Sequence, residues 1–124
     1  MRIDKLFSLK GKCAVVIGGS GKIGFPMSQA LAEAGARVYI ASRNKNNYDL
    51  AVKKLKIEGL DVKGITLDQS NENSVNNSIK IIKEEYRAPD ILINAGCSRP
   101  MTRFFNDTVE NWDKSMEVNA RGMF

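Results

Sequence analysis

Histidine is absent from the 124-residue sequence, and cysteine occurs only twice, at Cys13 and Cys97. Without histidine, catalysis by a Ser-His-Asp triad or a Cys-His pair within this chain is excluded. The two cysteines lie far apart and have no metal-binding partners, which argues against a disulfide framework and against a zinc site. We therefore expect two idle thiols and no metal site.

Long hydrophobic runs are also missing, since the Ala-Val-Val-Ile run at residues 14–17 stops at a glycine. A membrane-spanning helix needs about 20 apolar residues, so no membrane span is expected. The hydrophobic fraction of 43% and the charged fraction of 27% are typical of a folded domain, which excludes collagen-like, mucin-like and disordered chains. We expect a cytoplasmic protein.

Positive charge is unevenly distributed along the chain, whose net charge is +5. Residues 1–62 carry eleven Lys and Arg against five Asp and Glu, whereas residues 63–124 carry eight against nine. A basic half can bind nucleic acid or a phosphorylated small molecule. Because the basic residues are scattered and not interleaved with aromatic ones, we expect no nucleic-acid partner.

Four short segments, each rich in Val, Ile or Leu, predict buried β-strands. They are Cys13–Ile17, Arg37–Ala41, Val62–Leu67 and Asp90–Ile93, and each is bounded by Gly, Asn or Asp. Apolar residues at helical spacing lie between and after these strands, which predicts four helices. The positions that mark these helices are Met27, Ala30, Leu31 and Ala34 in the first helix, Leu50, Lys54 and Ile57 with Leu55 nearby in the second, Val75, Ile79, Ile82 and Tyr86 in the third, and Trp112, Met116 and Val118 or Asn119 in the fourth.

Polar residues and one glycine set the expected helix ends. The second helix should stop near Gly59, and the third should have Asn71 or Asn73 as its N-cap. The fourth should start after Asp107 and Thr108. Strands and helices therefore alternate, which predicts right-handed crossovers and an α/β fold with a Rossmann-like, doubly wound parallel sheet in the order 3-2-1-4. Such a sheet is incomplete, because its fourth strand is left as an open edge.

A glycine-rich turn, Gly-Gly-Ser-Gly-Lys-Ile-Gly at residues 18–24, connects the first strand to the first helix. Gly18 allows a sharp turn, Gly21 allows the backbone to approach a pyrophosphate, and Gly24 allows the helix to pack close to the sheet. The N-terminus of the helix offers free N–H groups and a positive dipole end to phosphates. The glycine-rich turn is not a Walker A loop, because Ile23 stands where that loop needs Ser or Thr.

Five segments in order resemble the short-chain dehydrogenase/reductase family over nearly the whole chain. Residues 11–24 resemble its opening strand and glycine turn, and residues 31–38 resemble the helix end and second strand that follow. Asp68 falls where the family has an aspartate beside the adenine, Asn94-Ala95-Gly96 resembles the Asn-Asn-Ala-Gly motif, and residues 118–124 resemble the Val-Asn-x-x-Gly-x-Phe helix. The resemblance implies that residues 1–124 are the N-terminal half of a single NAD(P)-binding Rossmann domain, with its catalytic half absent.

Departures from the family pattern are also visible. Ile17 replaces a threonine in the turn, Lys22 replaces a glycine, and Ile93 replaces the first Asn of Asn-Asn-Ala-Gly. The glycine spacing is closer to that of the longer, epimerase-like branch. The catalytic serine and Tyr-x-x-x-Lys of the family are missing, because Tyr39, Tyr48 and Tyr86 are followed four residues later by Arg, Val and Asp. We therefore expect the chain alone to be inactive.

The end of the second strand bears on the choice between NAD and NADP. An acidic residue at this position binds both ribose hydroxyls and repels a 2′-phosphate. Ser42 occupies this position here and Arg43 follows it, and a guanidinium can hold a phosphate with two N–H groups. We therefore expect NADP, with Lys22 as a second positive charge nearby, although NAD stays possible if Arg43 is only a solvated residue.

The residues expected to bind the cofactor share one location, the turn and the strand ends. They are Gly18, Ser20, Gly21, Lys22, Ile23, Gly24, Ser42, Arg43, Asp68, Gln69, Asn94, Ala95 and Gly96. The resemblance adds Asn119 as a catalytic residue that supports a proton-relay water. The expected function is an NADP-dependent oxidoreductase that interconverts an alcohol and a carbonyl, as a homodimer or homotetramer when complete. The alternatives are a nucleotide-sugar epimerase or dehydratase of the same fold, and a non-catalytic dinucleotide-binding protein.

Overall fold

The computed structural model describes residues 2–124 and has a four-stranded parallel sheet in the order β3-β2-β1-β4. The predicted α/β fold and strand order are confirmed. The strands end within one residue of the predicted positions: β1 is Cys13–Ile17, β2 is Arg37–Ser42, β3 is Val62–Thr66 and β4 is Ile91–Asn94. Residues of β1 are almost wholly buried, as expected for a parallel strand that is covered on both faces.

Helices separate the strands in the predicted order. Side chains cap three of them: Asn44 accepts a hydrogen bond from the Asn46 N–H, Asn71 from the Ser74 N–H and Thr108 from the Asn111 N–H. Across residues 2–124, no helix is both long enough and apolar enough to cross a membrane. The α-helices are α1 (Ile3–Leu6), α2 (Gly24–Glu33), α3 (Lys45–Ile57), α4 (Glu72–Glu85) and α5 (Val109–Asn119), and the 3-10 helices are η1 (Phe104–Asn106) and η2 (Arg121–Met123).

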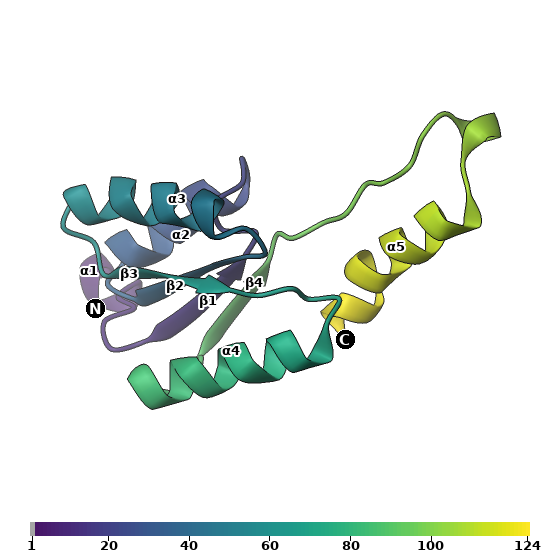
Figure 1. Ribbon diagram of the computed structural model, residues 1–124. Coiled ribbons are helices and arrows are strands. Elements are labelled where there is room, and N and C mark those ends of the chain that lie inside the picture. The colour runs from purple at the N-terminus through teal and green to yellow at the C-terminus, as the bar shows by residue number, and fades with distance from the viewer. Residues whose placement is uncertain (1) are drawn as a thin grey trace.

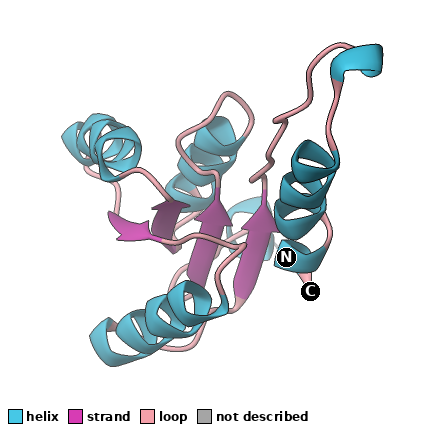
Figure 2. Cartoon of the chain, turned by 45° about the vertical axis from the view of Figure 1, so that its right-hand side comes forward, coloured by secondary structure: helices cyan, strands magenta, loops and turns pink. Residues whose placement is uncertain are grey.

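The sheet lies between two layers of helices, with α2 and α3 on one face and α4 on the opposite face (Figures 1 and 2). Alternate residues of each strand therefore enter two separate cores. Val16, Ile40 and Leu55 are fully buried in the core under α2 and α3. Val15, Tyr39 and Ile82 are buried in the core under α4. A long segment after β4 leads to α5 (Figure 1).

The helix faces that pack on the sheet differ from the predicted apolar stripes. Met27 is 41% exposed, and Leu50 and Ile57 are 64% and 79% exposed, so these residues of the predicted stripes do not pack on the sheet. In α2 short side chains take this place, because a helix approaches a strand more closely where its side chains are short, whereas α3 packs through Ala51 together with the larger Tyr48 and Leu55. The buried positions are Gly24, Ser28 and Ala32 in α2 and Tyr48, Ala51 and Leu55 in α3.

The stripes of the later helices are correct only in part. Ile82 of α4 is fully buried, whereas Ile79 and Tyr86 are each 37% exposed. In α5, Val118 is buried, but Trp112 and Met116 are 57% and 43% exposed. The apolar spacing therefore identified the helices correctly, but the stripes of α3, α4 and α5 each contain one buried residue and the stripe of α2 contains none.

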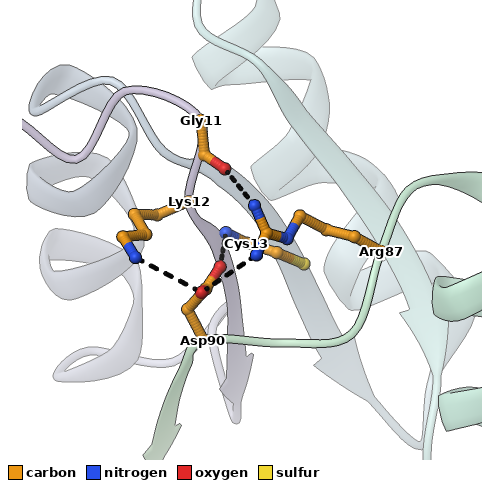
Figure 3. A network of polar contacts seen from close by, with 5 residues as sticks. All are labelled: Gly11, Lys12, Cys13, Arg87 and Asp90. Carbon is orange, nitrogen blue, oxygen red and sulfur yellow. Dashed lines mark hydrogen bonds and ion pairs between the residues drawn. The ribbon is translucent and has the colours of Figure 1, made fainter.

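An ion-pair network joins β1 to β4 at the end of the sheet where both strands begin (Figure 3). The Asp90 carboxylate accepts a hydrogen bond from the Cys13 N–H at 2.9 Å and lies 3.4 Å from both Lys12 Nζ and Arg87 Nη2. Arg87 also donates to the Gly11 carbonyl. One carboxylate therefore holds three segments at the end of the sheet opposite the glycine turn.

Candidate functional site

A cavity of about 240 Å³ lies across the carboxyl ends of the four strands. Parallel strands place their carboxyl ends at the same edge of a sheet, and ligands of open α/β sheets bind there. Nine of the residues expected to bind a cofactor line this cavity, and they come from the glycine turn and from all three remaining strand ends. They are Gly18, Ser20, Gly21, Ser42, Arg43, Asp68, Gln69, Ala95 and Gly96.

The first part of the site is the end of β1. Gly18 has a φ of +71°, a conformation that L side chains rarely adopt, and its N–H donates to the Ala41 carbonyl at 2.8 Å. A Cβ at Gly18 would lie 2.8 Å from the carbonyl carbon of Ala95. Glycine is therefore required here for two reasons, the turn itself and the close approach of the segment that follows β4.

The start of α2 forms the next part of the site. The fully buried hydroxyl of Ser28 donates to the Gly24 carbonyl at 2.9 Å and to the Gly19 carbonyl at 3.3 Å, which ties the helix to the turn. The N-cap residue, Ile23, offers no side-chain acceptor to the first turn. The Phe25 N–H donates to the Gly21 carbonyl and Pro26 has no N–H, so the amides available to an anion at this helix start are those of Ile23 and Gly24, which have no partner within the described residues.

The end of β2 brings Ser42 and Arg43 to the cavity. The Ser42 hydroxyl accepts a hydrogen bond from the Asn44 N–H at 3.3 Å, and this contact shapes the turn into α3. Within residues 2–124, Arg43 forms no ion pair. Its guanidinium is therefore a free positive charge beside the cavity.

The end of β3 contributes two polar side chains. One oxygen of the Asp68 carboxylate accepts hydrogen bonds from the Ser70 N–H at 3.0 Å and from the Ser70 hydroxyl at 2.6 Å. The side chain of the next residue, Gln69, is buried and donates to the Val118 carbonyl at 2.8 Å. This bond connects the end of β3 to α5.

The segment after β4 is fixed by backbone and side-chain bonds. The Ala95 N–H donates to the Ile17 carbonyl at 2.9 Å, and the Asn94 side chain accepts from the Gly96 N–H at 3.1 Å. Asn94 therefore shapes this turn, while Ala95 and Gly96 face the cavity. Small residues here leave room for a ligand to lie against the backbone.

Asn119 lies at the end of α5, and its side chain makes three hydrogen bonds. Its amide oxygen accepts from the Ser98 N–H at 2.9 Å, and its amide nitrogen donates to the Ser98 carbonyl at 2.8 Å and to the Ser115 hydroxyl at 3.1 Å. The side chain therefore clamps the segment after β4 to α5 and does not line the cavity.

Four further predicted residues do not line the strand-end cavity. Gly24 and Asn94 belong to the turns around it, Ile23 is 69% exposed, and Lys22 lies in an adjoining groove of about 610 Å³ between α2 and α3. Ser20 and Gly21 border both spaces, so the groove and the cavity are neighbours. Four further wall residues, apolar or sulfur-containing, were not predicted to bind the cofactor, and they are Ile17, Leu67, Cys97 and Val118.

The open parallel sheet, the glycine turn that leads into α2 and the cavity across the strand ends define a Rossmann-type domain. A family model described as short chain dehydrogenase matches residues 12–124. The chain therefore belongs to the short-chain dehydrogenase family.

Similar proteins include a gluconate 5-dehydrogenase from Gluconobacter oxydans, which is 34% identical over 122 residues, covering 96% of this chain and 46% of that protein. Tropinone reductase-like 3 from Erythroxylum coca is 34% identical over 113 residues, covering 90% of this chain and 44% of that protein. The chain spans about half the length of the curated relatives it matches.

Solved structures of similar proteins share the fold. A gluconate 5-dehydrogenase from Burkholderia cenocepacia, in complex with NADP and tartrate, aligns with a TM-score of 0.87 and 26% identity, covering 99% of this chain and 48% of that one. The NADP complex of RhlG from Pseudomonas aeruginosa aligns with a TM-score of 0.86 and 33% identity, covering 95% of this chain and 46% of that one.

Proposed function

We propose that this chain supplies the NADP-binding part of an oxidoreductase that interconverts an alcohol and a carbonyl. The observation that carries the proposal is the end of β2, where Ser42 and Arg43 border the cavity and no acidic residue follows before Asp49. A carboxylate at this position would repel a 2′-phosphate. The free guanidinium of Arg43 instead offers a partner for one.

The residues around the cavity fit a dinucleotide phosphate. The amide groups at the start of α2 suit the pyrophosphate, and Ser42 and Arg43 suit the 2′-phosphate on the adjoining ribose. Leu67 and Ala95 offer apolar walls for the flat base, and Asp68 offers an acceptor for its edge. The two similar structures that contain NADP support the same choice of cofactor.

The nicotinamide of the cofactor supplies the hydride chemistry when it is bound. The part played by this chain is to bind and orient the cofactor at the strand ends. The resemblance assigns Asn119 to catalysis, and its hydrogen bonds support a positioning role, because they hold the segment after β4 against α5. No Tyr-x-x-x-Lys occurs in the 124 residues, so the proposal assigns no acid–base group to this chain.

The test compares the dissociation constants of NADPH and NADH for the wild type and for Arg43→Asp by fluorescence titration. We expect the wild type to prefer NADPH and the variant to prefer NADH, because the substitution replaces an attraction with a repulsion. A hydrogen bond between charged groups contributes about 1.5–3 kcal/mol, which corresponds to roughly tenfold to a hundredfold in affinity.

Arg103→Asp is the matched control, because Arg103 is an exposed arginine that does not line the cavity. This variant should keep the wild-type preference. Equal dissociation constants of NADPH and NADH for the wild type would contradict the choice of NADP.

A further inference from the structure

The groove of about 610 Å³ between α2 and α3 lies outside the strand-end cavity and has no part in the proposed function. The two helices cover the same face of the sheet (Figure 1). On the side of α3, the residues that line the groove are Asn47, Leu50, Ala51 and Lys54. Positions three, four and seven apart lie on one side of a helix, so the wall of the groove follows α3 for two turns, which is about 10 Å.

The middle of the groove is apolar. Phe25 and Pro26 line it from α2, and Leu50 and Ala51 line it from α3. Ala51 is buried and Phe25 is half-buried, whereas Leu50 is 64% exposed. Leu50 belongs to the predicted apolar stripe of α3, but it borders this groove and does not pack on the sheet. A large apolar side chain that is exposed beside other apolar residues is typical of a surface that contacts another protein.

The charged residues of the groove are all positive. Lys22 lines it from the glycine turn and Lys54 from α3, and no acidic residue lines it. Within residues 2–124, neither lysine forms an ion pair, and Lys54 Nζ lies 5.9 Å from the centre of the Phe25 ring of the facing helix. Asp49, the one acidic residue of α3, is paired with Lys45. The groove therefore presents two free positive charges beside an apolar strip.

We propose that this groove binds an acidic amphipathic helix of a partner protein. A helix with apolar residues three, four and seven positions apart presents an apolar face that matches the two-turn strip, and acidic residues beside that face meet Lys22 and Lys54. A phosphorylated small molecule would pair with the lysines but would leave Leu50 uncovered, so a helix is the better fit. The inference goes beyond the proposed function and needs no bound cofactor, because the groove shares only Ser20 and Gly21 with the strand-end cavity.

Fluorescence anisotropy with a labelled synthetic peptide tests the proposal. The peptide has about fifteen residues, or four helical turns, with leucines three, four and seven positions apart and glutamates on both sides of them. A shuffled peptide of the same composition and charge is the first control. We expect the ordered peptide to bind saturably to the wild type in the presence of excess NADPH, and the shuffled peptide to bind at least about tenfold more weakly, because shuffling removes the apolar face but not the charge.

Two substitutions in the groove should each weaken binding of the ordered peptide by about tenfold, namely Leu50→Ser and Lys54→Glu. Their matched controls are Ile57→Ser and Lys56→Glu, because both residues are exposed in α3 but do not line the groove, and these variants should keep the wild-type affinity. The Lys54→Glu variant should also bind a peptide in which lysines replace the glutamates more tightly than the wild type does, since the charges are then complementary again.

The groove and a general attraction between lysines and acidic peptides give different results. Equal binding of the ordered and shuffled peptides, or equal losses in Leu50→Ser and Ile57→Ser, would show general attraction only and would overturn the inference. Displacement of the peptide by NADPH would locate it in the strand-end cavity, and this result, like the absence of binding at millimolar peptide, would also overturn it. If the peptide binds as expected but NADPH does not bind, the proposed function fails and the inference stands.

Discussion

Gly21 and Gly24 lie in the same turn, but an added methyl group would meet different surroundings at the two positions. At Gly24, a Cβ would lie 2.7 Å from the Gly18 carbonyl carbon and 2.9 Å from the Gly19 Cα, and neither backbone atom can move away without disturbing the turn. At Gly21, the nearest atom is the Gly18 carbonyl oxygen, at 3.3 Å. We therefore expect Gly24 to be needed for folding and Gly21 to be needed for ligand binding.

Gly24→Ala and Gly21→Ala test this separation. Gly24→Ala should lower the free energy of unfolding by about 1–3 kcal/mol or more, because overpacking against backbone forces α2 away from the turn. Gly21→Ala should leave the melting temperature close to the wild-type value, yet weaken NADPH binding by about tenfold or more, because its methyl group occupies the side of the turn proposed for the pyrophosphate. Thermal melts and titrations of both variants are the measurement. Equal losses of stability in the two variants would contradict this account of the turn.

The residues at the strand ends were predictable from sequence because each follows an apolar strand in a fixed motif. The position of Val118 in the cavity wall was not predictable, since its contact with Gln69 joins residues 49 positions apart. The packing of a remote helix end on the cavity depends on the path of the chain after β4, and no local pattern encodes that path. The same path of the chain brings Ser98 next to Asn119, so the two hydrogen bonds between these residues were not predictable either.

An apolar pattern predicts where a helix lies in the sequence better than it predicts which face of the helix packs on the sheet. Periodicity located α2, α3 and α4 correctly, because only a helix brings residues three and four apart onto one side. Two residues of the predicted stripe of α3, Leu50 and Ile57, nevertheless lie away from the sheet, whereas Leu55 of the same stripe is fully buried. The sheet is also contacted by Ala51 and by Tyr48, whose ring packs against Gly64 of β3. The face of α3 that packs on the sheet is set by the fit between side chains of different size on the helix and on the strand. The sequence of one element alone does not show this fit.

The network around Asp90 connects elements and predicts a pH dependence. The hydrogen bond from the Cys13 N–H, followed by the charges of Arg87 and Lys12, holds the pKa of the Asp90 carboxyl below its ordinary value. The folded state therefore binds the proton less readily than the unfolded state. The stabilisation is complete above the ordinary pKa of about 4 and is lost as the pH falls through the lower pKa of the folded state.

Urea denaturation between pH 7 and pH 3 measures this effect. The wild type should lose stability as the pH falls below about 4, and Asp90→Asn should be less stable at pH 7 and show a smaller loss toward pH 3. Asp113→Asn serves as the control, because it removes an exposed carboxylate of α5 and should follow the wild-type profile. An Asp90→Asn protein with the wild-type slope would show that the network does not couple folding to this proton.

At the scale of the whole molecule, two parts of the chain differ in how well their apolar side chains are covered. The core under α2 and α3 is well covered, whereas Leu92 of β4 is 66% exposed and Trp112 of α5 is 57% exposed. Met123 and Phe124 are also exposed. The curated relatives are about twice as long as this chain, and exposed apolar side chains of this size are typical of surfaces that pack against further protein.

The central claim is that a nicotinamide dinucleotide phosphate binds across the carboxyl ends of the four strands. A titration of the ¹⁵N-labelled protein with NADPH, followed by amide chemical shifts, tests it most directly. The account predicts shifts at Gly18, Gly21, Arg43 and Gly96, and none at Gly11 or Gly59, which lie outside the cavity. Shifts confined to the groove between α2 and α3, or the absence of any shift at millimolar NADPH, would contradict it.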